Sequence, residues 1–195
     1  MKTKTFAAAS ALFLLGNAIG LAQSYQAFLD GPSESPPNAS PATGFAQVTI
    51  DLALHTLQID VSFSGLTGTS TASHVHAPTT TPLSGTANVA TQTPSFSGFP
   101  LGVTSGTYSH MFDTTQTSTW NSAYVTANGG TAAGAEAAFA QALADGKAYL
   151  NIHSTTFGGG EIRGFLLPVP EPATIALFVV GGAGLIVTAR KSRRS

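Results

Sequence analysis

Residues 45–66, FAQVTIDLALHTLQIDVSFSGL, alternate between apolar and polar side chains on both sides of a short break. Successive side chains of a β-strand point to opposite faces, so a period of two predicts strands with one buried face. We therefore expect a β-hairpin here, with its turn near residues 53–56. The expected core positions are Ala46, Val48, Ile50 and Leu52 in the first strand, and Leu57, Ile59, Val61 and Phe63 in the second.

Shorter stretches on both sides of the hairpin indicate further elements. Strands are expected at residues 25–31, 71–78, 107–115, 147–154 and 160–167. Within residues 131–146 apolar side chains recur at helical spacing, until Asp145 and Gly146 end the pattern. Residues 79–134 are rich in Thr, Ser, Gly and Pro and are expected to be mostly loop. The prediction is one β-rich domain, residues 24–167, with one short helix.

The first 22 residues have the three parts of a secretory signal peptide. Lys2 and Lys4 form a positive start, an uncharged apolar core follows, and Gly20 and Ala22 are small residues near its end. We expect export through the Sec machinery, with cleavage between Ala22 and Gln23. The alternative, a permanent membrane anchor, needs a longer apolar core than this one.

Residues 168–195 combine three features in order. Pro170, Glu171 and Pro172 form an extended segment, residues 173–189 are uncharged, and residues 190–195 hold four of the eight Lys and Arg residues. This pattern predicts a transmembrane helix with a cytoplasmic basic end. The order resembles the PEP-CTERM sorting signal. The resemblance implies recognition by an exosortase, transient anchoring in the inner membrane of a Gram-negative-type bacterium, removal of the tail, and transfer to the cell surface or extracellular matrix.

The composition of the domain excludes some classes of partner. Residues 24–167 hold only Lys147 and Arg163 against eight carboxylates, a formal charge of −6. Phosphate contacts need a basic surface, so we expect no nucleic-acid partner. The chain has no cysteine, so an exported domain of this sequence must rely on packing instead of disulfides.

Three histidines are the candidate metal ligands. His74 and His76 lie two positions apart in an expected strand, so they share a face while Val75 points to the other. Their α-carbons would lie roughly 6–7 Å apart, which allows both rings to reach one ion at about 2.0 Å. His153 shares a face with Asn151 in a later strand, and it completes the site if the two strands approach. Copper and zinc are the metals that we consider.

The alternative for the same residues is a hydrogen-bond network without metal. Asn151, Glu161 and Arg163 could bond with the histidines or orient them as outer partners. No fourth ligand is evident, and Arg163 would repel a cation. The sequence alone therefore favours the network and no cofactor over a copper or zinc site.

Short motifs, including those that contain the three histidines, follow a recognisable order along residues 25–167. They are Leu29-Asp30-Gly31, Glu34, Pro36-Pro37, Gly44, Gly65-Leu66-Thr67-Gly68, Ala72, His74-Val75-His76-Ala77-Pro78, Tyr149-Leu150-Asn151-Ile152-His153 and Gly160-Glu161-Ile162-Arg163-Gly164. In this order they resemble the CHRD domain, a module named after chordin and also found in exported bacterial proteins. The resemblance implies an all-β fold, an immunoglobulin-like or barrel-like β-sandwich. It implies no activity, because the molecular role of that family is largely undefined.

Three functions remain open from the sequence. The first is a surface or matrix protein with a structural or binding role and no catalysis, because the chain has no Gly-x-Ser-x-Gly elbow, Walker loop or His-Glu-x-x-His helix. The second is a copper or zinc protein, since His-Val-His is similar to the copper strand of Cu/Zn superoxide dismutase, although the disulfide cysteines of that family are absent. The third is a module that binds exopolysaccharide through Trp120, Tyr124 and Tyr108. Besides exopolysaccharide, we consider other surface proteins as binding partners of the domain.

Overall fold

The computed structural model describes residues 22–170, so the expected signal peptide up to residue 21 and the sorting segment from residue 171 lie outside the described residues. Within residues 22–170 no helix is long and apolar enough to cross a membrane. The elements are β1 (Gln23–Asp30), β2 (Thr43–Asp51), β3 (Thr56–Ser64), β4 (Ser70–His76), β5 (Gly106–Asp113), the 3₁₀ turn η1 (Thr117–Thr119), α1 (Ser122–Ala127), α2 (Ala132–Ala144), β6 (Tyr149–Ser154), β7 (Ile162–Phe165) and β8 (Leu167–Pro168).

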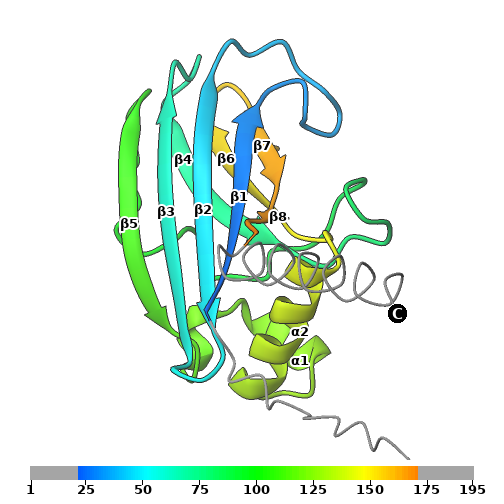
Figure 1. Ribbon diagram of the computed structural model, residues 1–195. Helices are drawn as coiled ribbons and strands as arrows, with labels where there is room; N and C mark the ends of the chain where they lie inside the picture. Colours follow the sequence, from blue (N-terminus) through cyan, green and yellow to red (C-terminus); the bar gives the residue numbers. More distant parts are fainter. Residues whose placement is uncertain (1–21, 171–195) are drawn as a thin grey trace, which may run out of the picture.

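The eight strands form one antiparallel sheet in the order β4-β6-β7-β1-β2-β3-β5, and the short β8 also pairs with β1. Figure 1 shows this sheet curled into a half-barrel, with β4 and β6 behind β2 and the two helices at one end. The mostly β, barrel-like prediction is confirmed. A sandwich of two separate sheets is not observed for the described residues, because β1 pairs with β2 on one edge and with β7 on the other.

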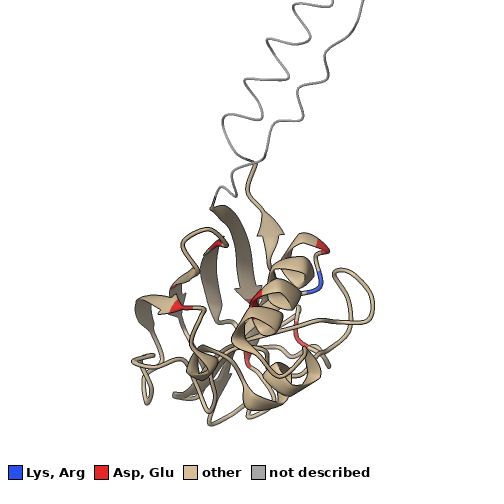
Figure 2. Cartoon of the chain, turned by 90° about the horizontal axis from the view of Figure 1, so that it is seen from below, with Lys and Arg blue, Asp and Glu red and all other residues tan. Residues whose placement is uncertain are grey.

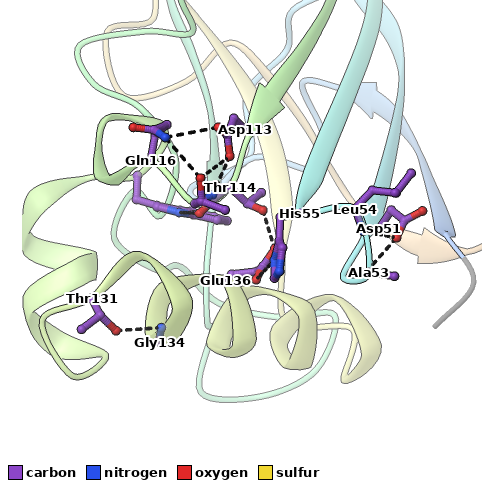
Figure 3. Close-up of polar contacts among 12 residues, drawn as sticks. Asp51, Ala53, Leu54, His55, Asp113, Thr114, Gln116, Thr131, Gly134 and Glu136 are labelled. Atoms are coloured by element: carbon purple, nitrogen blue, oxygen red, sulfur yellow. Dashed lines mark hydrogen bonds and ion pairs between the residues drawn. The ribbon is translucent and has the colours of Figure 1, made fainter. Parts of the chain in front are cut away.

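The predicted hairpin is β2–β3, which pairs from Thr43 with Ser64 to Asp51 with Thr56. Its alternating apolar side chains are buried in the core, except that of Leu52, which lies in the turn with 46% of its surface exposed. The Asp51 carboxylate closes the turn by accepting hydrogen bonds from the next backbone N–H groups (Figure 3). The alternation therefore determines both the strands and the face that they bury.

The predicted helix is α2, and its ends carry the expected signals. The Thr131 hydroxyl accepts a hydrogen bond from the Gly134 N–H (3.1 Å) at the first turn, and Gly146 follows the last turn with φ +65°. The left-handed region favours glycine at that position. The structure adds the short helix α1, which the sequence did not predict and which the Asn121 side chain caps.

A buried carboxylate ties the hairpin turn to α2. The Glu136 side chain, 6% exposed, accepts hydrogen bonds from the Thr114 hydroxyl and from Nδ1 of His55 (2.9 Å to Oε2), as Figure 3 shows. His55 is thus half-exposed but anchored to the helix. This contact holds the helices against one end of the sheet.

The long connection between β4 and β5, residues 77–105, runs back along the free edge of β4; we call it the edge loop. Its backbone pairs with β4 through Ala90 N–H to the Val75 carbonyl (2.9 Å) and Phe96 N–H to the Ser73 carbonyl (3.2 Å). An exposed strand edge is a template for unwanted pairing, so this loop protects the sheet. The loop therefore belongs to the folded domain and is more than a surface elaboration.

The aromatic residues proposed for carbohydrate stacking lie in the core. Trp120, Tyr124 and Tyr108 are at most 7% exposed, and Trp120 packs against Phe139 of α2 with ring centroids 5.3 Å apart. Their faces are therefore closed to a sugar ligand. Figure 2 shows that charged residues are few on the domain, as the composition predicts.

Candidate metal centre

The three histidines lie on two neighbouring strands. β4 and β6 pair antiparallel, with His74 opposite Asn151, His76 opposite Tyr149, and His153 at the next position on the same face. The ring centroids are 5.2 Å apart for His74 and His153, 5.7 Å for His74 and His76, and 6.3 Å for His76 and His153. The structure thus brings together the residues that the sequence proposed as ligands.

Each imidazole is fixed from behind by a backbone carbonyl. The bonds run from Nε2 of His74 to Pro94 (2.7 Å), from Nδ1 of His76 to Ala87 (2.8 Å), and from Nδ1 of His153 to Gly158 (2.9 Å). A carbonyl oxygen can only accept, so the bonded ring nitrogen must carry the hydrogen. Such outer bonds are the usual way in which proteins orient metal-binding histidines.

The second nitrogen of each ring is consequently a lone pair without a hydrogen. These nitrogens, Nδ1 of His74 and Nε2 of His76 and His153, are buried and have no hydrogen-bond partner. One nitrogen of each ring lies within 4.8 Å of those of the other two. Zinc–nitrogen distances of about 2.0–2.1 Å need nitrogens roughly 3.4 Å apart in a tetrahedron, so an ion would draw the rings slightly together.

Burial keeps the three rings neutral. It lowers the pKa of His74 to about 4, because a buried site disfavours the charged imidazolium. Burial is also the largest cause of the lowered pKa values of His76 and His153, and the hydrogen bonds to the carbonyls oppose the shift. Neutral imidazole is the form that binds metal, so the site is competent at neutral pH without losing protons.

Arg163 lies on β7 opposite Asn151 and contacts the Tyr149 ring. The centroids of the His76 and Tyr149 rings are 4.9 Å apart, and the two rings stack. The guanidinium of Arg163 is 4.7 Å from the centroid of the Tyr149 ring. Arg163 donates to the carbonyls of Ser33 and Gly85, and its Nε lies 3.8 Å from Glu34 Oε2. Its charge still helps to lower the pKa of His76, and it is opposed by the Glu34 carboxylate.

Glu161 is buried but faces other partners. Its carboxylate accepts hydrogen bonds from the Ser40 hydroxyl (2.7 Å) and from the N–H (2.6 Å) and hydroxyl of Thr67. Burial alone would raise the pKa of Glu161, but its hydrogen-bond donors outweigh burial and lower it. No hydrogen bond among residues 22–170 joins Glu161 to a histidine, so the network that the sequence favoured does not form around this residue.

Glu34, which the sequence placed only among the CHRD-like motifs, lies near the site. Burial raises its pKa to about 7, and the charge of Arg163 opposes that shift. A carbon built as Cβ on Gly160 would lie 2.5 Å from Glu34 Oε1 and 2.9 Å from Asn151 Nδ2, so both groups reach the space that this glycine leaves open. The sequence signal for Glu34 was its place among the CHRD-like motifs, which carried no role.

Comparison with protein families agrees with the architecture and with the C-terminal pattern. A family model described as the PEP-CTERM protein-sorting motif matches residues 168–194, so the protein is exported and sorted in an exosortase-dependent manner to the cell envelope or surface. Searches of curated proteins and of solved structures found no match. The family model of the CHRD domain matches residues 25–166, which include every strand from β2 to β7 and all three histidines. The chain belongs to the CHRD domain family.

Proposed function

We propose that this protein is a metal-binding surface protein whose CHRD domain holds one copper or zinc ion through His74, His76 and His153. One observation carries the proposal: three buried lone pairs converge with no partner, while the opposite nitrogens are all fixed by carbonyls. Leaving buried polar atoms unpaired costs roughly 1–3 kcal/mol each, and a bound ion would satisfy all three at once.

The hydrogen-bond network is the weaker alternative for these residues. Two acceptor nitrogens cannot bond to each other, and the neutral rings have already used their hydrogens on the carbonyls. The repulsion expected from Arg163 is opposed by the Glu34 carboxylate, whose Oε2 lies 3.8 Å from Arg163 Nε. The geometry therefore weakens the objection to a metal site that was based on Arg163.

We propose a binding or structural role for the ion, without catalysis. The three nitrogens are buried, whereas a catalytic zinc or copper site keeps a position open to substrate. After Sec export and removal of the C-terminal tail, the domain would reside at the cell surface or in the extracellular matrix, with surface proteins or exopolysaccharide as its neighbours. A superoxide assay on the metal-loaded protein should show no activity above that of the free ion.

Calorimetric titration of the purified protein with zinc and with copper tests the metal site. We expect one ion per chain with a dissociation constant below the micromolar range, and loss of that binding in His76→Ala and His153→Ala. The matched control is His110→Ala, which removes an exposed strand histidine outside the cluster. Binding that persists in His76→Ala, or that is equally lost in His110→Ala, would refute the proposal.

A further inference from the structure

The three imidazoles leave one position of a four-coordinate ion to be filled. Resting on the metal site proposed above, we propose that the side-chain oxygen of Asn151 is the fourth ligand, and that Glu34 holds the amide in the orientation that this requires. The nearest candidates of other kinds, carboxylates and thiolates, are not within the cluster among residues 22–170. The choice of Asn151 follows from its register, its unpaired oxygen and the position of its amide nitrogen.

Asn151 lies at the centre of the cluster. It is directly opposite His74 in the pairing of β4 with β6, and it precedes His153 by two positions on the same face. The side chain is 2% exposed, and its Oδ1 is buried without a hydrogen-bond partner. A buried, unpaired oxygen thus lies beside the three unpaired nitrogens.

The amide nitrogen of Asn151 lies near Gly160. A Cβ built on Gly160 would lie 2.9 Å from Asn151 Nδ2 and 2.5 Å from Glu34 Oε1, which is also buried and unpaired. Glu34 Oε2 in turn faces Arg163. Arg163 is directly opposite Asn151 in the pairing of β6 with β7, so the Arg163–Glu34 pair borders the amide. A carboxylate next to the amide N–H group polarises it and makes the oxygen a better ligand for a cation.

This arrangement would give three nitrogen ligands and one oxygen ligand, all uncharged. Structural zinc sites are closed and four-coordinate, and imidazole with oxygen suits zinc and copper(II). Glu34 would supply the nearest negative charge from outside the coordination sphere. The closed sphere also accounts for a site that binds an ion without offering it to a substrate.

Cobalt(II) is the probe that tests the fourth ligand, since its visible spectrum responds to coordination number and to added ligands. In the wild-type protein, azide should leave the cobalt spectrum unchanged. In Asn151→Ala the position opens, so azide should shift the spectrum and zinc affinity should fall at least tenfold. Asn151→Asp, which keeps an oxygen at the same place, should restore both properties. Glu34→Gln should lower zinc affinity severalfold, as expected for an outer partner.

Gln47→Ala is the control for loss of an amide, because Gln47 bonds only to Gln26 on a distant part of the sheet. Circular dichroism of each variant before metal is added verifies the fold, and Asn151→Asp keeps the test valid should the alanine variant misfold. Zinc affinity within twofold of wild type in Asn151→Ala, or an azide response already present in wild type, would overturn the assignment of Asn151. A wild-type affinity in Glu34→Gln would overturn the role of Glu34. Absence of metal from the wild-type protein would refute the metal site itself and this ligand with it.

Discussion

At the scale of single residues, the fold decides where each imidazole carries its hydrogen. In each ring one N–H donates a hydrogen bond to the carbonyl of Pro94, Ala87 or Gly158. The other ring nitrogen therefore carries no hydrogen and can only accept. His74 uses Nδ1 for this purpose, whereas His76 and His153 use Nε2. The difference arises because His74 donates to its carbonyl through Nε2, whereas His76 and His153 donate through Nδ1. The site is therefore organised before any ion arrives.

The neutrality of these rings predicts an unusual dependence of metal binding on pH. A proton competes with the ion for the same lone pair, and burial shifts that competition to lower pH by lowering the pKa of His74 to about 4 and those of His76 and His153 in the same direction. Zinc affinity should thus be nearly constant from pH 7.5 to 6 and fall steeply only below about pH 5. A peptide of residues 70–80, with ordinary histidines, should lose zinc already near pH 6.5. Parallel curves for the protein and the peptide would contradict the prediction.

Gly160 is the position where a single carbon should disturb the site. Gly160→Ala would place Cβ 2.5 Å from Glu34 Oε1 and 2.9 Å from Asn151 Nδ2, at a backbone φ of +134° that side chains rarely adopt. We expect a loss of about 1–3 kcal/mol in the free energy of unfolding, together with weaker zinc binding. Gly159→Ala is the matched control, because a Cβ there meets nothing within 4 Å. Denaturant titration of both variants measures the difference, and equal stability would contradict the crowding.

Some of these residues could be predicted from the sequence and others could not. The shared face of His74 and His76 follows from the two-residue period of a strand. The nearness of His153 depends on pairing between β4 and β6, which are far apart in the chain, so only a conditional prediction was possible. Glu34 lies in a loop without sequence periodicity. It approaches Gly160 only in the tertiary structure, so its position could not be predicted from the sequence.

At the scale of elements, the strands that alternate most regularly are the ones that sequence predicts best. β2 and β3 follow the pattern of apolar positions, and α2 follows the helical stripe with its terminal Gly146. The edge loop has no such pattern, because its backbone pairs with β4 at irregular intervals. Yet this loop supplies the carbonyls of Ala87 and Pro94 to two of the histidines. The contribution of the edge loop to the site could therefore not be predicted from the sequence.

The contact between the hairpin turn and α2 predicts a local contribution to stability. Glu136→Ala would leave the fully buried Thr114 hydroxyl without its acceptor and free His55 from the helix. We expect the free energy of unfolding to fall by about 1–3 kcal/mol. Asp145→Ala, which removes a more exposed carboxylate at the other end of α2, should change it by less than about 0.5 kcal/mol. Thermal unfolding of the two variants provides the comparison, and an effect of Asp145→Ala as large as that of Glu136→Ala would show that the contact has no special role.

At the scale of the whole molecule, the described chain enters and leaves the domain side by side. Tyr25 of β1 pairs with Pro168 of β8, and the Val169 N–H donates to the Ser24 carbonyl at 2.8 Å. The expected signal cleavage after Ala22 falls just before β1, and the sorting motif begins at β8. Processing at either end would therefore leave the sheet, the core and the histidine cluster complete.

This placement predicts what mass spectrometry of the protein from the cell surface should find. The mature chain should begin near Gln23 and should lack residues 190–195 with the apolar segment before them, because the sorting motif directs exosortase-dependent processing. The sequence predicts an extended segment at Glu171, because this residue lies between Pro170 and Pro172. Glu171→Ala should interrupt that recognition, so the tail stays attached and the protein remains in the membrane fraction, while the domain folds as before. An intact tail on wild-type protein recovered from the surface would contradict tail removal, and correct release of Glu171→Ala would show that recognition does not depend on this carboxylate.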